Sequence, residues 1–181
     1  MFTFDAHLDL SLNAVEYGRD LRKSVTDIRQ AEAGMTDLAG RRHGTVSLPE
    51  MRKAGVGLCV ATQIAGCMKP AAPVGSHDTP DQAWEATQKQ LAWYRQMEQE
   101  GQMRQLSTWE QIHQHMLDWD ADPDSPPIGY ILSLEGADSL RTLDDLQTAH
   151  KYGLRAIGPA HYGMGRYAPG HDQDAPLPPE G

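Results

Sequence analysis

The sequence has few cysteines, no excess of basic residues and no long apolar run. It contains 2 cysteines, Cys59 and Cys67, and neither belongs to a CxxC pair, which argues against a disulfide scaffold or a structural zinc knuckle. Lys and Arg number 16 against 25 Asp and Glu, for a formal net charge of −9. Nucleic-acid binding needs a basic surface, so this balance argues against a nucleic-acid partner.

Targeting segments and common catalytic signatures are also missing. No apolar stretch approaches the ~20 residues of a membrane span. Residues 1–10 contain two acids and a histidine, unlike a secretory signal peptide, so we expect a cytoplasmic protein. No GxGxxG motif follows a predicted strand, and neither a GxxxxGK[ST] motif nor a GxSxG motif occurs. Nucleotide binding and serine-hydrolase chemistry therefore have no support.

The hydrophobic pattern predicts an α/β fold. The chain has 181 residues, enough for one core, so we expect a single domain over residues 1–181. The predicted strands cover residues 1–10, 56–64, 128–134 and 154–157, and the main predicted helices cover residues 47–55, 79–100, 107–116 and 139–152. Such alternation is the signature of a parallel sheet. Ser47, with Glu50 three residues later, predicts a capping box, and residues 163–181 predict an irregular tail.

His7 and Asp9 form the strongest local feature. On a strand, residues two apart point to the same side, so their side chains would project together. An imidazole and a carboxylate are a partial ligand set for a catalytic zinc-type site, which needs three or more protein ligands. The alternative is that His7 makes an ordinary hydrogen bond and that Asp9 caps a helix.

Glu135 and His161 each follow a predicted strand. Barrels of the (β/α) type collect their catalytic groups at the carboxyl ends of the strands, which is where both residues fall. A carboxylate at Glu135 can bridge two metal ions, although it could instead cap the next helix or pair with an arginine. Acidic or imidazole groups at the ends of three different strands predict a metal-binding rim.

At these residues the chain resembles the membrane (renal) dipeptidase family. The matching stretches are residues 5–10 (DAHLDL), 47–57 (SLPEMRKAGVG), 132–137 (LSLEGA) and 153–157 (GLRAI) leading to His161. They run in the family's order across nearly the whole chain. The resemblance implies the N-terminal portion, about four β/α units, of a TIM-like (β/α)8 barrel.

The resemblance also implies a zinc-dependent hydrolase of dipeptides. His7 and Asp9 would bind one metal ion of a binuclear zinc centre, and Glu135 would bridge both ions. His161 would lie beside the substrate as a catalytic residue that stabilises the tetrahedral intermediate. Metal-activated water would attack the peptide carbonyl.

The chain departs from the family in its extent. The family draws two further metal-binding histidines, an acid that handles the proton and an arginine for the substrate carboxylate from later strands. A whole barrel takes ~250 residues, so we expect completion by a missing C-terminal half or by a homo-oligomer, and little activity in this chain alone. The alternatives are an inactive remnant or interaction module that keeps the half-barrel fold, and a related hydrolase of a ring amide or lactone.

Overall fold

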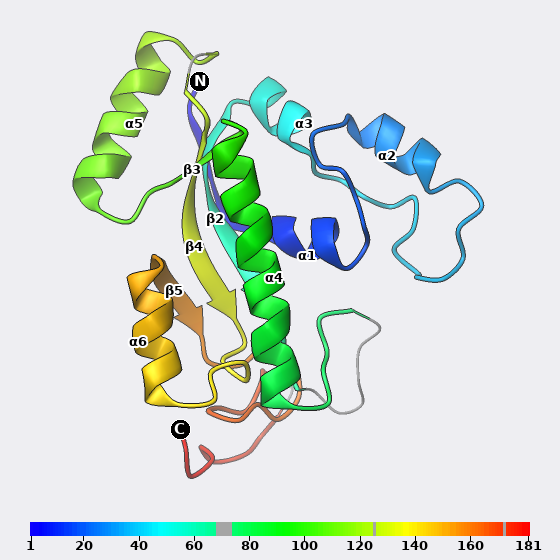
Figure 1. Cartoon of the computed structure of the whole chain (residues 1–181), viewed down its shortest axis with the longest axis vertical. Coiled ribbons are helices and arrows are strands. Elements are labelled where there is room, and N and C mark those ends of the chain that lie inside the picture. Colours follow the sequence, from blue (N-terminus) through cyan, green and yellow to red (C-terminus); the bar gives the residue numbers. More distant parts are fainter. Residues whose placement is uncertain (68–73, 125, 172) are drawn as a thin grey trace.

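The computed structural model describes residues 1–67, 74–124, 126–171 and 173–181 and shows helices packed against one parallel sheet (Figure 1). In chain order the elements are β1 (Thr3–Leu8), α1 (Leu10–Val15), α2 (Val25–Ala31), α3 (Leu48–Lys53), β2 (Val56–Ile64), α4 (Pro80–Gln99), β3 (Met103–Gln105), α5 (Trp109–Ala121), β4 (Ile128–Glu135), α6 (Leu143–Lys151) and β5 (Leu154–Gly158). The connection between the predicted strand over residues 56–64 and the predicted helix over residues 79–100 falls partly outside the described residues. No helix among the described residues combines the length and apolar character needed to cross a membrane.

The sheet confirms the predicted parallel α/β architecture. β2 lies between β1 and β4, and β3 and β5 both pair with the other side of β4. β3 covers the start of β4, where Met103 pairs with Ile128, whereas β5 covers its end, where Gly158 pairs with Glu135. Because every pairing is parallel, the carboxyl ends of the strands share one edge, which lies at the bottom of Figure 1.

Several elements differ from the sequence prediction, and α1 and α2 lie outside the main predicted helices. β3 was not predicted, because three residues are too few to show alternation. α5 extends to Ala121, beyond the predicted end at residue 116, and Trp119 in this added turn is buried. α6 begins only at Leu143, because the side chain of Thr142 accepts a hydrogen bond from the amide of Asp145 and caps the helix there.

The predicted capping box at Ser47 is wrong. Ser47 is the N-cap of α3, but its hydroxyl makes no capping hydrogen bond. The side chain is fully buried, and its Oγ has no hydrogen-bond partner within the described structure. The start of the helix is held instead by the backbone, where the amide of Leu48 donates to the carbonyl of Leu21 over 2.8 Å.

α4 covers the central strands and fixes the end of β2. Tyr94 of α4 stacks on Tyr130 of β4 with ring centroids 5.0 Å apart, and both side chains are fully buried. Gln90 of α4 accepts a hydrogen bond from the amide of Ile64 (2.8 Å) and donates one to its carbonyl (2.7 Å). These contacts hold β2 in place up to the edge where the candidate site lies.

Candidate metal centre

Three predicted site residues meet at the carboxyl edge of the sheet. His7 lies near the end of β1, Asp9 is the N-cap of α1, and Glu135 is the last residue of β4. β2 separates β1 from β4 in the sheet and ends in register with Glu135, at Ile64. Gly136 then adopts a positive φ of 76°, a conformation that suits glycine, and turns the chain away from the strand.

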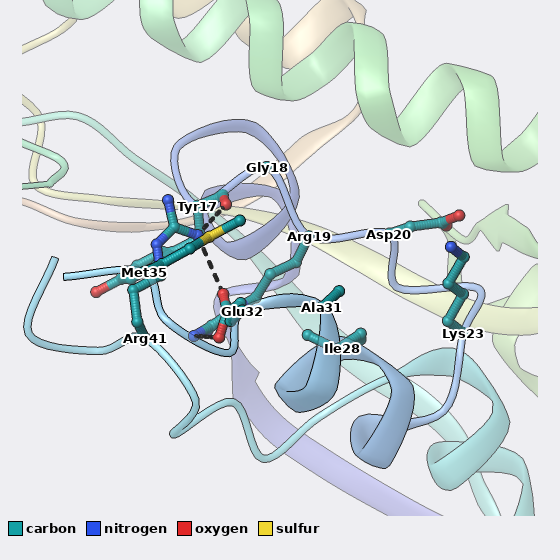
Figure 2. Close-up of a pocket in the computed structure, with 10 residues that line it drawn as sticks. All are labelled: Tyr17, Gly18, Arg19, Asp20, Lys23, Ile28, Ala31, Glu32, Met35 and Arg41. Carbon is teal, nitrogen blue, oxygen red and sulfur yellow. Dashed lines mark hydrogen bonds and ion pairs between the residues drawn. The ribbon is translucent and has the colours of Figure 1, made fainter. Parts of the chain in front are cut away.

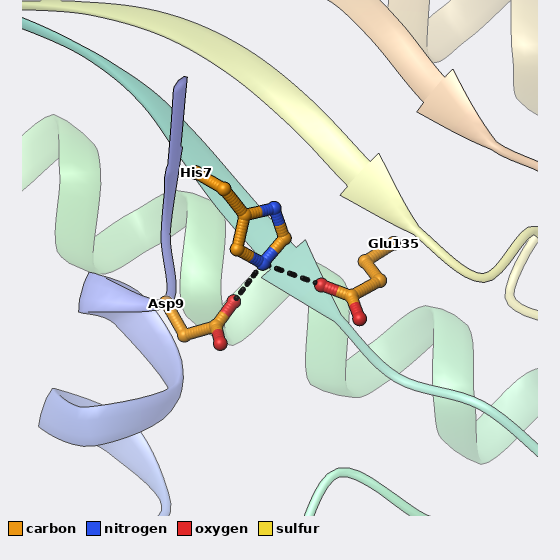
Figure 3. Close-up of side chains that lie close together, drawn as sticks. All are labelled: His7, Asp9 and Glu135. Carbon is orange, nitrogen blue, oxygen red and sulfur yellow. Dashed lines mark ion pairs between the residues drawn. The ribbon is translucent and has the colours of Figure 1, made fainter. Parts of the chain in front are cut away.

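The three side chains point toward one another (Figure 3). Nε2 of His7 lies 3.4 Å from Oδ1 of Asp9 and 2.9 Å from Oε2 of Glu135. One ligand atom from each residue lies within 4.8 Å of the other two. Zinc–ligand bonds in proteins are about 2.0–2.2 Å for nitrogen and oxygen, so tetrahedral ligands around one ion lie at spacings of this order.

The carboxylates at this edge lack sufficient positive partners. Oδ1 of Asp9 and Oε2 of Glu135 are the buried oxygens that face Nε2 of His7, and neither has another polar partner within the described structure. Burial raises the pKa of Asp9, and the nearby imidazoles of His7 and His161 only partly offset that effect. Two buried carboxylate oxygens that share a single imidazole fit a divalent cation, which would neutralise both acids.

His161 lies against the other side of Glu135. Its Nδ1 is 3.0 Å from Oε1 of Glu135, so this carboxylate sits between the imidazoles of His7 and His161. The imidazole of His161 also packs against the ring of Tyr162, with centroids 4.3 Å apart. The structure thus brings all four predicted residues together, with His161 next to the three-residue group rather than within it.

An open pocket adjoins these residues on the sheet. It has a volume of about 260 Å³, and His7, Thr62, Ser133 and Glu135 contribute to its lining. The hydroxyl of Ser133 donates to Oγ1 of Thr62 over 3.3 Å, and the other lining residues are aliphatic residues and glycine. The pocket therefore opens beside the Glu135 carboxylate but is mainly apolar.

Two supporting residues were not predicted from the sequence. The side-chain amide of Asn13 donates to the backbone carbonyl of Asp9 over 2.8 Å and fixes the start of α1. Asp138 accepts hydrogen bonds from two loops at the same edge. Asn13 lies four residues after Asp9, a spacing that brings helical residues together, whereas the partners of Asp138 are far away in the sequence.

Comparison with solved structures shows a fold of the membrane dipeptidase type. A metallopeptidase named dipeptidase AC, of peptidase family M19, superposes with a TM-score of 0.61 at 19% identity over 91% of this chain and 45% of its own. The probable dipeptidase PvdM from Pseudomonas aeruginosa superposes with a TM-score of 0.65 at 15% identity over 93% of this chain and 37% of its own. No protein-family model and no curated protein matches the sequence.

This chain spans less than half the length of either solved structure, although nearly all of this chain superposes on each of them. The resemblance seen in the sequence is therefore confirmed at the level of fold: the chain forms part of a dipeptidase-like (β/α) barrel.

Proposed function

We propose that this chain supplies the N-terminal metal-binding part of a zinc-dependent dipeptidase, located in the cytoplasm. The observation that carries the proposal is the convergence of His7, Asp9 and Glu135 at the carboxyl edge of a dipeptidase-like sheet. In barrels of this type the catalytic groups gather at that edge. The two superposed structures are described as a metallopeptidase and a probable dipeptidase, which supports a metal-dependent hydrolase.

In this proposal His7, Asp9 and Glu135 would hold zinc, and the resemblance to the family implies that Glu135 would be shared between two ions. An imidazole nitrogen and carboxylate oxygens are ligands that zinc prefers in catalytic sites. Zinc bound there would supply Lewis acidity and activate water for attack on a carbonyl carbon. The convergence of Nε2 of His7 on the carboxylates of Asp9 and Glu135 supports the role of these residues as ligands of one ion.

His161 is proposed to act on the substrate rather than on the metal. Its side chain is 43% exposed, against 14% for Glu135, so a substrate can reach the imidazole from solvent. A histidine there can donate a hydrogen bond to an oxygen that gains negative charge as the peptide bond is attacked. The proposed substrates are dipeptides, and the remaining ligands would come from a C-terminal half-barrel or from a second copy.

The direct test is dipeptide hydrolysis by the complete product of the gene that encodes this chain. With zinc supplied, we expect turnover that is lost on removal of zinc and reduced about a hundredfold or more in Glu135→Gln, as when a group acting in the transition state is removed. Glu50→Gln is the matched control, because Glu50 pairs with Lys53 in α3, before β2 begins.

Two outcomes would overturn this assignment. A zinc-free protein without peptidase activity would favour a noncatalytic interaction module. Turnover in Glu135→Gln equal to that of Glu50→Gln would remove the bridging role of Glu135.

A further inference from the structure

Asp138 connects three loops at the same edge of the sheet. It lies in the loop between β4 and α6 and is 5% exposed. Its Oδ2 accepts a hydrogen bond from the amide of Cys67 over 2.8 Å, and its Oδ1 accepts one from the amide of Arg166 over 2.7 Å. Cys67 follows β2 and Arg166 follows β5, so one carboxylate joins loops that are distant in the sequence.

The loop after β5 carries His161 and folds back on it. The amide of His171 donates to the carbonyl of His161 over 3.2 Å, and the amide of Gly170 donates to the carbonyl of Gly163 over 2.7 Å. Gly170 packs so closely on the backbone of His161 that a Cβ there would clash with the His161 carbonyl oxygen. The segment of residues 161–171 is therefore a closed turn, and His161 moves with it.

Asp138 is the buried anchor of this closed turn. A Cβ at Gly165, next to Arg166, would lie 3.4 Å from Oδ1 of Asp138, so the backbone of the turn approaches the carboxylate directly. Hydrogen bonds from amides to an ionised acceptor are stronger than those between neutral groups. Loops over the carboxyl ends of strands otherwise tend to be mobile.

We propose that Asp138 is a positioning residue that sets His161 against Glu135. The hydrogen bond to Arg166 fixes the turn that carries His161, and the bond to Cys67 ties that turn to the loop after β2. Glu135 lies three residues before Asp138, at the end of β4, so the same short segment carries the carboxylate and the anchor for its histidine partner. Any effect of Asp138 on catalysis rests on the proposed function, whereas its effect on the position of His161 is independent of that function.

The test compares two isosteric variants of buried carboxylates, Asp138→Asn and Asp145→Asn. Asp145 is 8% exposed and bonds to the backbone and guanidinium of Arg141, outside the closed turn. Hydrogen exchange of backbone amides is followed by mass spectrometry without metal. We expect exchange in residues 159–171 to rise about tenfold in Asp138→Asn only, because that substitution leaves a buried amide without its acceptor.

A second measurement reports on His161 itself. The rate of modification by diethyl pyrocarbonate is measured for His161, with His150 as the internal reference. Once the closed turn opens, His161 leaves Glu135, so we expect its rate to rise several-fold in Asp138→Asn and to stay unchanged in Asp145→Asn. Asp138→Ala, which removes both acceptors, should raise it further.

The outcomes separate this proposal from the proposed function. Exchange that rises equally over the whole chain in both variants, or an unchanged modification rate of His161, would overturn the positioning role of Asp138. Neither measurement needs zinc, so a wild-type protein that fails to bind zinc would contradict the metal centre alone.

Discussion

Two regions of this molecule bury carboxylates in opposite ways. Glu32 lies in a pocket formed by residues after α1 and is 3% exposed (Figure 2). It receives hydrogen bonds from Nε of Arg19 at 2.8 Å, from Nη1 of Arg41 at 3.1 Å and from the amide of Arg42 at 2.6 Å. These partners lower the pKa of Glu32 to about 2, with the hydrogen bond from Arg19 as the main cause.

The candidate metal centre lacks such cations among the described residues. The buried oxygens of Asp9 and Glu135 face the imidazole of His7 and have no other polar partner in the described structure. Burial raises the pKa of Asp9, whereas arginine lowers that of Glu32. The comparison shows that a buried acid alone does not mark a site. An acid whose charge is neutralised by arginine supports the fold, and an acid left without such a partner suits an added cation.

The largest change in stability is expected when Glu32, the acid that pairs with arginine, is substituted. Glu32→Gln should lower the free energy of unfolding by ~3–5 kcal/mol, because it leaves Arg19 buried without its counter-charge. Urea denaturation followed by circular dichroism measures this change. Asp37→Asn is the control, since Asp37 also pairs with Arg41 but its side chain is 59% exposed. Equal losses in the two variants would contradict the buried pairing.

Zinc should stabilise the protein through the other region. At a zinc concentration about a hundredfold above the dissociation constant, the free energy of unfolding should rise by about 2.7 kcal/mol, because zinc binds only the folded ligand set. Thermal unfolding with zinc and with a chelator measures the difference. His7→Ala should remove it, and the same stabilisation in that variant would place zinc elsewhere.

Acid should weaken the protein through Glu32. Its pKa is about 2 in the folded chain against an ordinary 4.5, so the folded state prefers the ionised form. The resulting stability is fully present above about pH 4.5 and is lost as the pH falls toward 2. Denaturation midpoints across this range should therefore fall less steeply for Glu32→Gln than for the wild type. Parallel pH profiles would contradict the lowered pKa.

The smallest effect is expected at Asp9 without metal. Its raised pKa means that the folded state disfavours the charged form, and its side chain makes no capping hydrogen bond to α1. Asp9→Asn should therefore keep the free energy of unfolding within about 0.5 kcal/mol of the wild type or raise it slightly, while zinc stabilisation is lost. A large loss of stability would show that Asp9 supports the fold, as Glu32 does.

Much of the fold and of the candidate site follows from local sequence patterns. The apolar runs of β2 and β4 predicted buried parallel strands, and the spacing of His7 and Asp9 placed both side chains on one side of the chain. Glu135 was found because it directly follows an apolar strand. Each of these signals lies within a few residues, although β1 ends at Leu8, so Asp9 is oriented as the N-cap of α1 and not by the strand.

The unpredicted features depend on contacts between distant residues. Arg19 and Glu32 pair across a segment that contains α2, a helix that the sequence did not predict, so nothing local marks them as partners. Asp138 meets Cys67 and Arg166, which are 71 and 28 residues away. β3 forms because its three residues pair with Ile128–Tyr130, on the side of β4 that β2 does not occupy. Such pairings are decided by tertiary packing rather than by local preference.

Zinc titration by isothermal calorimetry is the sharpest test of whether His7, Asp9 and Glu135 form one metal centre. We expect zinc to bind the wild-type chain with a defined stoichiometry and the affinity to fall about tenfold or more in each of His7→Ala, Asp9→Asn and Glu135→Gln. Glu50→Gln should bind as the wild type does. Wild-type affinity in the three ligand variants, or no zinc binding to the unmodified chain, would rule out this metal centre.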